Sequence, residues 1–542
     1  MVLKHKHLVW IIALFIGLSV DWLFWEKPGG INFFILVFAS VIGGLIPAWL
    51  NKIHIPLASY LLIIPITFFS AMTFIRSEPF TTVINILITI SLLILFSMTL
   101  RTGAWVKFNF IDHLTALFRF FGNAFTGGIL FFTRIKNRPT ANQSKPTPDV
   151  AEQRNFLYQA SPYLRGILLA LPILVVLTAL LASADPVFNL RLQNLLQGFE
   201  LPNIGEYLFR LFYILVIGYL LLSAYYFGLA ESEKLQASSP EKNKFAQILG
   251  WIEANIILGG INLLFLAFVS LQFTYLFGGE TNIHLEGFTY AEYARRGFFE
   301  LLAVALFTLM VYYALSIITR RESIINQRVF SASGLLLVGL VSIILISAYT
   351  RLTLYEAAYG FTRLRTLTHI FILWVGLLLA AVALLEILGN FNRMALTLIV
   401  FILGFGLSVN LVNVDNLITR HNIARSLLPG DETISTTLDA GYLYSLSWDS
   451  IPPLVTSFTN PETPEPIQQE IGGVLACRLF EAAPEQRHPW TSWHYTRSRA
   501  IELLNQQSSA LEAFPIIESE GIFVEVSGEQ RLCSPFMTSI VD

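Results

Sequence analysis

The chain has 542 residues, of which 54% are hydrophobic and only 13% are charged. Soluble domains carry about 25% charged residues, so this composition, with a mean hydropathy of +0.62, excludes an ordinary water-soluble protein. The net charge of −2 argues against nucleic acid as a main partner. The 44 Phe and 10 Trp suit a lipid-facing surface with aromatic belts at the headgroups.

Eleven segments are long and apolar enough to cross a bilayer, which takes about 20 residues in a helix. The first follows a basic start like that of a secretory signal. Asp21 and Trp22 stand where a signal would have small residues for cleavage, so we predict a retained anchor. The predicted spans are residues 8–25, 31–50, 56–74, 80–100, 164–184, 204–229, 246–277, 298–319, 330–349, 366–388 and 395–412. They predict an all-α integral membrane protein.

Two further segments have the pattern of amphipathic helices. In residues 105–132, apolar residues recur at helical spacing with polar residues between them, which predicts a helix lying in the membrane interface. A second such stripe covers residues 188–199. Between them, residues 134–154 are rich in Pro, Lys, Asn and Gln and predict a flexible linker.

The pattern predicts four regions. These are residues 1–135 (four spans and the interfacial helix), 136–160 (a cytoplasmic linker), 161–412 (seven spans) and 413–542 (a small, mostly helical domain). Lys and Arg gather in the loops on the N-terminal side of the membrane and are much rarer in the other loops, which places the N-terminus in the cytoplasm. Eleven spans then bring the C-terminal domain to the extracytoplasmic side.

Both cysteines, Cys477 and Cys533, lie in the polar C-terminal domain. An oxidising compartment would allow a disulfide between them, and otherwise they are two unpaired thiols. In the same domain the periodicity predicts a helix over residues 433–448, ended by Pro452-Pro453. It also predicts a helix over residues 492–507 and a short strand over residues 521–526.

Charged residues gather in two of the predicted outer loops. In the first, Thr289 and Glu292 have capping-box spacing, so the structural interpretation is favoured for Glu292, Arg295 and Arg296. Residues 351–365 are harder to explain by structure alone. Arg351, Tyr355 and Tyr359 share one helical face there, Gly360 is a natural helix end, and Thr362 would cap the next span.

Acids and arginines at one membrane surface suit an anionic headgroup or carboxylate, because the guanidinium fork matches phosphate and carboxylate geometry. A structural ion network that includes Asp185, Glu292 and Asp415 is an equally good interpretation. The candidate ligand-binding residues are Asp185, Glu292, Arg295, Arg296, Arg351, Tyr355, Glu356, Arg363, Arg365, Asp415 and Arg420.

No motif for nucleotide binding, zinc proteolysis or serine hydrolysis occurs in the sequence, and we expect neither a cofactor nor a metal site. No acid or base lies clearly at the middle of a span, which weakens a proton- or sodium-coupled transporter. Asn85 and Asn262 lie near mid-span and are expected to form hydrogen bonds between helices.

Several short motifs together resemble one family of membrane proteins. They are ASADPVF at 182–188, YAEYARRGFFEL at 290–301, YEAAYGFTRLR at 355–365, NVD at 413–415, RHNIAR at 420–425, LSWD at 446–449 and RSRA at 497–500. They resemble the uncharacterised bacterial membrane proteins grouped as DUF 4153 / DUF 4173. The resemblance implies a polytopic protein of the bacterial plasma membrane and implies no activity.

The leading hypothesis is a non-enzymatic membrane protein that binds a lipid, an envelope component or a partner protein at its outer face. The main alternative is a transferase acting on a lipid-linked substrate, with Asp185, Glu292 or Asp415 as acid or base and the arginines holding phosphate. A transporter is the third hypothesis. Whether the protein is an enzyme stays open at this point.

Overall fold

The structure is a computed structural model that describes residues 6–136, 174, 177–178, 181–197, 204–233, 248–276, 298–320, 323–427, 438–485, 488–519 and 521–533. The chain divides into two compact units. Unit 1 comprises Met1–Trp25, Ile42–Ile53 and Arg119–Ala230, and unit 2 comprises Glu26–Val41, His54–Phe118 and Glu231–Asp542. Each unit is described by itself.

Ten helices among the described residues are long and apolar enough to cross a membrane. These spans are His7–Phe24, Ile31–Leu50, Leu57–Ile75, Pro79–Thr99, Gly205–Glu231, Trp251–Gln272, Phe299–Ile318, Ile324–Ala357, Arg363–Ile387 and Met394–Val412. They correspond to ten of the eleven predicted spans. The other prediction, residues 164–184, falls largely outside the described residues. An all-α membrane fold is therefore confirmed.

Unit 1 is built on α1 (Lys6–Phe24) packed along α9 (Ile204–Tyr226), which ends in the π-helical turn η2 (Phe227–Glu231). A Cβ on Gly17 would lie 2.9 Å from the Ile214 carbonyl oxygen, so only glycine lets these two helices approach so closely. Arg210 pairs with Asp21 at 2.6 Å. Two predicted amphipathic segments are helical, as α6 (Phe110–Lys136, shared with unit 2) and α8 (Pro186–Gln197), and their interfacial position stays a prediction.

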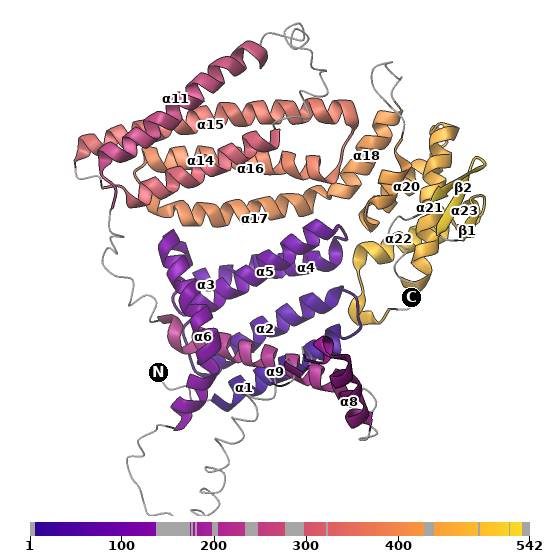
Figure 1. The fold of residues 1–542 in the computed structure, drawn as a ribbon, viewed down its shortest axis with the longest axis horizontal. Coiled ribbons are helices and arrows are strands. Elements are labelled where there is room, and N and C mark those ends of the chain that lie inside the picture. The colour runs from indigo at the N-terminus through magenta and orange to yellow at the C-terminus, as the bar shows by residue number, and fades with distance from the viewer. Residues whose placement is uncertain are drawn as a thin grey trace, which may run out of the picture. The chain divides into compact units, whose positions relative to one another are not determined.

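Unit 2 holds most of the membrane-length helices. Their bounds are Ile31–Leu50 for α2 (shared with unit 1), Leu57–Leu61 for α3, Ile63–Ile75 for α4, Pro79–Thr99 for α5, Trp251–Leu276 for α11, Phe298–Ile318 for α14, Ile324–Tyr359 for α15, Arg363–Ile387 for α16 and Met394–Val412 for α17. Short 3-10 turns are η1 (Ala104–Val106) and η4 (Phe391–Arg393). Helix α15 packs against α11, α14 and α16, and α17 packs against α16 and α5 (Figure 1).

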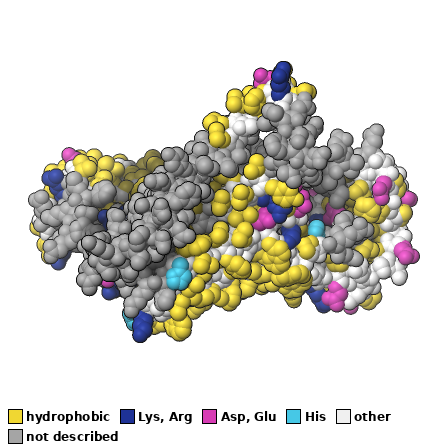
Figure 2. All heavy atoms as spheres, turned by 90° about the horizontal axis from the view of Figure 1, so that it is seen from below, with side chains coloured by type: hydrophobic (Ala, Val, Ile, Leu, Met, Phe, Trp, Pro, Cys, Tyr) yellow, Lys and Arg dark blue, Asp and Glu magenta, His cyan; other side chains and the backbone are white. Residues whose placement is uncertain are grey.

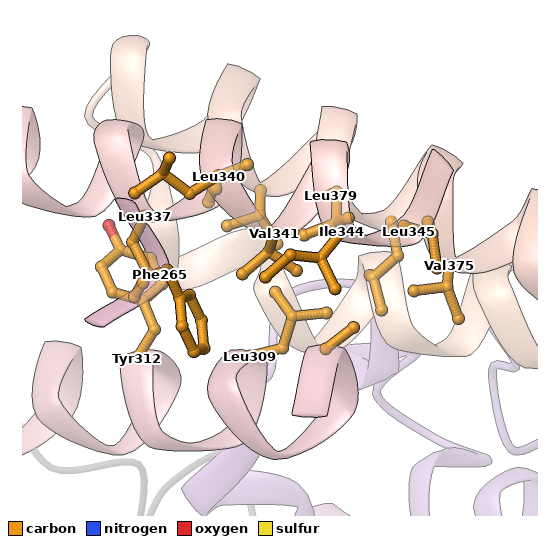
Figure 3. Packing of buried hydrophobic residues seen from close by; sticks show 14 of the residues in the cluster. Phe265, Leu309, Tyr312, Leu337, Leu340, Val341, Ile344, Leu345, Val375 and Leu379 are labelled. Atoms are coloured by element: carbon orange, nitrogen blue, oxygen red, sulfur yellow. The ribbon is translucent and has the colours of Figure 1, made fainter. Parts of the chain in front are cut away.

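Apolar side chains fill the space between α11, α14, α15 and α16. Figure 3 shows Phe265, Leu309, Tyr312 and Val341 meeting in this core, and all four are buried. Outward-facing side chains are also apolar, and hydrophobic residues cover much of the described surface in Figure 2. This pattern suits a bundle whose solvent is lipid, because both its inside and its outside are then apolar.

The predicted hydrogen bonds between helices are present in unit 2. The side-chain amides of Asn85 on α5 and Asn410 on α17 are fully buried and bond to each other at 3.0 and 2.7 Å. Asn262 on α11 donates to the carbonyl oxygen of Ser333 on α15 at 3.0 Å. Asn85 and Asn262 therefore form hydrogen bonds between helices, as the sequence predicted.

The C-terminal region of unit 2 is mostly helical with a small sheet. Its elements are α18 (Val414–Ser426), α19 (Ala440–Ser445), η5 (Trp448–Ser450), α20 (Ile451–Thr459), α21 (Glu465–Glu485), η6 (Trp490–Ser492), α22 (Tyr495–Gln506), α23 (Ser508–Leu511), β1 (Ile516–Glu518), β2 (Ile522–Val526) and β3 (Glu529–Leu532). The three strands are antiparallel in the order β1-β2-β3. The predicted helix near 492–507 and the strand near 521–526 correspond to α22 and β2.

The helix predicted over residues 433–448 is partly wrong. Among the described residues it covers only α19, because Leu446 has an extended backbone that ends the helix. Pro452 and Pro453 do not end a helix: they lie in the first turn of α20, where their missing N–H groups have no intrahelical partner to lose.

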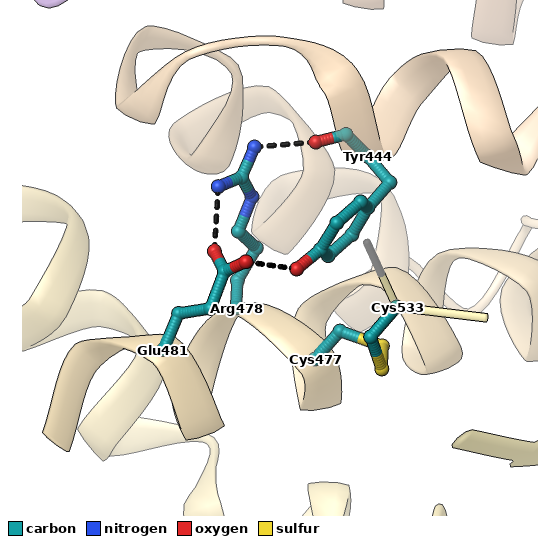
Figure 4. The surroundings of a disulfide bond; sticks show 5 residues. All are labelled: Tyr444, Cys477, Arg478, Glu481 and Cys533. Carbon is teal, nitrogen blue, oxygen red and sulfur yellow. Dashed lines mark hydrogen bonds and ion pairs between the residues drawn. A yellow bond between two sulfur atoms is a disulfide. The ribbon is translucent and has the colours of Figure 1, made fainter. Parts of the chain in front are cut away.

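A disulfide joins Cys477 on α21 to Cys533, with 5.5 Å between the two Cα atoms (Figure 4). Both cysteines are buried in the second apolar core of unit 2, which combines α18–α22 and β2 with residues of α16 and α17. Beside it Arg478 donates to Glu481 at 2.7 Å, and its guanidinium lies 4.7 Å from the Tyr444 ring centroid. The disulfide thus ties the end of β3 to α21, one of the helices that build this core.

Candidate functional site

The charged residues singled out in residues 351–365 lie where α15 ends and α16 begins. Helix α15 has 36 residues, so at 1.5 Å per residue it is about 54 Å long, well beyond the ~30 Å hydrocarbon core. It runs unbroken to Tyr359, and Gly360 ends it with a positive φ of 78°. Thr362 occupies the N-cap position of α16, although its side chain makes no cap hydrogen bond.

Arg363, the first residue of α16, forms a two-pronged ion pair with Asp415 on α18. Its Nε and Nη2 donate to the two carboxylate oxygens at 2.8 and 2.7 Å, and its Nε lies 3.8 Å from Glu78 Oε1. Asp415 is fully buried and also accepts a hydrogen bond from the Ser447 backbone N–H at 2.7 Å. This geometry leaves neither oxygen of Asp415 without a partner.

A second buried carboxylate, Asp449, ties the C-terminal region to the turn between α4 and α5. It accepts hydrogen bonds from the backbone N–H and the hydroxyl of Ser77 at 2.7 and 2.9 Å. The Thr496 hydroxyl lies 3.3 Å from Asp449 Oδ1, and Arg76 Nη1 lies 3.6 Å from the same atom. The long-range partners of Asp449 thus come from α22 and the α4–α5 turn, and Ser447 adds a local one at 3.4 Å.

We call the side chains of Arg76, Glu78, Arg363, Asp415 and Asp449 the joint. Three of them are carboxylates that are at most 4% exposed. Removing one partner of a buried ion pair is far more costly than the pair is worth, because a charge stays buried without compensation. The joint therefore holds the C-terminal region on the ends of α4, α5 and α16.

A different arrangement surrounds Arg365, two residues along α16. Its guanidinium lies 3.9 Å from the centroid of the Tyr355 ring and 6.0 Å from that of Tyr359, and its Nη1 donates to the Gly360 carbonyl oxygen at 2.6 Å. It forms no ion pair with a carboxylate in the described part of the chain. A positive charge is therefore held on aromatic rings rather than neutralised.

Arg425 on α18 adds a second positive charge near Arg365. Burial lowers the pKa of the Arg425 guanidinium, and repulsion from Arg365 lowers it further. Asn422 fixes the same corner, because its side chain accepts from the Phe361 N–H and donates to the Phe361 carbonyl oxygen, each at 2.9 Å. We call Tyr355, Tyr359, Arg365, Asn422 and Arg425 the arginine corner.

Glu356 belongs to neither group. It is 4% exposed, and its Oε2 lies 2.9 Å from Nδ1 of His369 on α16. Its Oε1 has no hydrogen-bond partner among the described residues. Arg351 lies two turns before the end of α15 with its Nε buried.

The other predicted site residues are not in these clusters. Asp185 is exposed in unit 1, where its side chain accepts from the Val187 N–H at 2.8 Å and caps α8. Arg420 is exposed on α18. Glu292, Arg295 and Arg296 lie outside the described residues. Among the residues that the structure describes, no group of three or more His, Cys, Asp or Glu side chains is placed to hold a metal ion.

Sequence reasoning missed several members of these clusters. Glu78 caps α5 and accepts from the Phe80 and Thr81 N–H groups at 3.0 and 2.6 Å, and a Glu-Pro pair before an apolar run was a usable signal. Asp449 stood in the quoted LSWD motif. Arg425 lies in the RHNIAR motif, but it was not predicted as a binding residue. It is 60 residues from Arg365 in the sequence, so the sequence alone does not show that the two arginines are close in space.

The membrane-length helices define the class of this molecule: it is a polytopic integral membrane protein. Comparison of the sequence with models of protein families identifies the family to which the chain belongs. The chain belongs to the family described as "Domain of unknown function (DUF4153)", which matches residues 63–457, from α4 to α20. This match covers the joint and the arginine corner. No curated protein and no solved structure matches the chain.

Proposed function

We propose that this protein is a non-enzymatic membrane protein that binds an anionic group of an envelope lipid or partner protein at the arginine corner. The proposal rests on the surroundings of Arg365. Its guanidinium lies against tyrosine rings, and it forms no ion pair with a carboxylate among the residues that the structure describes. Two neighbouring arginines repel each other, and an anion placed between them would relieve that repulsion.

The contrast with Arg363 supports this choice. Arg363 and Arg365 lie within one turn of α16, yet among the residues that the structure describes Arg363 has an acidic partner and Arg365 has none. The joint accordingly has its charges paired inside the protein, whereas the charge of Arg365 lies on aromatic rings, where an anion can pair with it. Tyr359 is 54% exposed, so a headgroup or an acidic side chain can reach the corner from outside.

The transferase alternative has less support. A general acid or base needs a carboxylate that a substrate can reach. Both oxygens of Asp415 are occupied by Arg363 and Ser447, and Asp185 caps a helix.

Replacing Arg365 by Gln tests the proposal. We expect the variant to bind dihexanoyl phosphatidylglycerol, a soluble anionic phospholipid, about tenfold more weakly than the parent, because one charge-assisted contact is lost. Titration calorimetry on the detergent-solubilised full chain measures this affinity. The matched control is Arg420→Gln, which removes an exposed arginine from α18 and should bind as the parent does. Unchanged affinity in Arg365→Gln, or equal losses in both variants, would contradict the proposal.

The same proposal places the C-terminal region on the extracytoplasmic side. The first residue of α2, Ile31, donates its N–H to the Trp493 carbonyl oxygen at 2.9 Å, so α2 begins beside the C-terminal region. One span, α1, separates that point from the N-terminus. The two chain ends therefore belong on opposite sides of the membrane, and the basic loops assign the N-terminal side to the cytoplasm.

Eleven spans fit this arrangement better than ten. Phe110 contacts the Tyr313 ring near the end of α14, with 5.6 Å between ring centroids, and Leu249 donates to the Ile318 carbonyl oxygen at the same helix end. A chain that leaves the membrane and returns to it on the same side crosses the membrane an even number of times in between. Helix α9 supplies one crossing, and the predicted span at residues 164–184 would supply the second.

A further inference from the structure

A cavity of about 320 Å³ lies beside the first turns of α22, away from the arginine corner. The residues that line it include Trp490, Ser492, Trp493, His494, Arg497 and Ser498. Trp490 is 63% and Trp493 is 43% exposed. The family match ends before this cavity, which is a feature of the C-terminal residues.

The backbone around the cavity is fixed directly on the membrane helices. Besides the hydrogen bond from Ile31 to Trp493, a Cβ on Gly30 would lie 2.5 Å from the Ser492 backbone, so only glycine permits this approach. The Thr496 hydroxyl donates to the Ile75 carbonyl oxygen at the end of α4. Since α2 begins and α4 ends here, the cavity lies at the level where the hydrocarbon core gives way to headgroups.

A run of aromatic rings leads from the side of the bundle to the cavity. Phe34 on α2 lies 6.1 Å from Phe38 and 5.6 Å from Phe74 on α4, and Phe74 lies 5.8 Å from Trp493, all between ring centroids. Phe38 is 53% exposed. Aromatic residues at a membrane boundary suit the zone where acyl chains join headgroups.

The cavity offers polar groups for a phosphate. Ser492 is 2% exposed, and its hydroxyl has no hydrogen-bond partner among the described residues. A buried hydroxyl without a partner is costly unless something else satisfies it. Arg497 brings the positive charge. Burial lowers the pKa of His494 to about 4, so its imidazole is neutral at pH 7 and accepts from the Arg497 N–H at 3.4 Å.

We infer that this cavity is a second binding site, which takes the phosphate headgroup of a membrane phospholipid. Arg497 and the Ser492 hydroxyl contact the phosphate, and the tryptophans line the glycerol region. The acyl chains lie along the aromatic run Trp493–Phe74–Phe34–Phe38. Free inorganic phosphate has the same charged group without the chains, so the aromatic run favours the lipid.

The test uses the full-length Arg365→Gln protein in detergent, so that binding at the arginine corner is weakened. We expect dihexanoyl phosphatidylglycerol to bind this protein, and a further Arg497→Gln change to weaken binding at least tenfold. Ser492→Ala should weaken it severalfold without changing the charge. Arg499→Gln is the matched control, because Arg499 is on the same helix, is half exposed, pairs with Glu502 at 2.7 Å and does not line the cavity.

Three results would overturn the inference. One is equal binding by the Arg497→Gln and Arg499→Gln proteins. Another is inorganic phosphate binding as tightly as the phospholipid and displacing it, which would assign the cavity to the free ion. The third is that the Arg365→Gln protein binds neither the phospholipid nor inorganic phosphate. A lower affinity of the Arg365→Gln protein than of the parent is a different result, which tests only the arginine corner.

Discussion

Replacing Asp415 by Ala should lower the free energy of unfolding by about 3–5 kcal/mol, the usual cost of breaking a buried ion pair by removing one partner. The variant leaves Arg363 partly buried with only Glu78 near it, at 3.8 Å, and leaves the Ser447 N–H without its acceptor. Unfolding in mixed micelles by titration with a denaturing detergent measures the change. Arg420→Ala, on the exposed side of α18, is the control and should change stability by less than about 0.5 kcal/mol.

A double variant separates the ion pair from simple loss of packing. Arg363→Gln with Asp415→Asn removes both charges and keeps similar side-chain volumes. It should be more stable than the Arg363→Gln single variant, because Asp415 then no longer carries a buried charge without its counter-charge, and Glu78 keeps its hydrogen bonds from the Phe80 and Thr81 N–H groups in both proteins. Additive effects of the two single changes would show that the residues do not act as a pair. The account of the joint would then be wrong.

Replacing Cys477 and Cys533 by Ser should destabilise the C-terminal region by about 4 kcal/mol, the chain-entropy value for a closed loop of this length. The two cysteines are 56 residues apart in the sequence, and the loop contains α22 and all three strands. The pulse-proteolysis pattern of detergent-solubilised protein measures the effect. We expect cleavage within residues 488–533 at denaturant concentrations at which the parent resists.

The parent protein treated with a reductant is the control, since it has the same sequence without the bond. It should be cleaved as the double-serine variant is. Equal protease resistance of the parent, the reduced parent and the variant would show that the disulfide does not stabilise this region.

The membrane bundle was largely predictable from the sequence because lipid imposes a simple rule. A spanning helix must be apolar along its whole length. The end of α15 at Gly360 was also predictable, since glycine adopts the positive φ that terminates a helix. The helical segment around residues 433–448 was less predictable. Its periodicity continues through Leu446, but hydrogen bonds from Ser447 to Asp415 and Asp449 hold the chain extended there.

The candidate site was only partly predictable. The sequence marked Arg363, Arg365 and Asp415 as one group, and nothing local distinguishes the two arginines. The structure separates them because Arg363 is directed at Asp415 and Arg365 at Tyr355. Asp449 contacts Ser77, which is 372 residues away in the sequence, and Thr496, which is 47 residues away. Such pairing depends on tertiary packing, which periodicity does not report.

The measurement that tests this account most directly is the side of the membrane on which each chain end lies. Two reporters fused in turn after Asp542 decide it: alkaline phosphatase, which is active only outside the cytoplasm, and a green fluorescent protein that folds only inside. With the N-terminus shown to be cytoplasmic by the same fluorescent protein, we predict an active phosphatase and a dark fluorescent protein at the C-terminus. Fluorescence at both ends, with an inactive phosphatase, would contradict the topology and the outer position of both proposed sites.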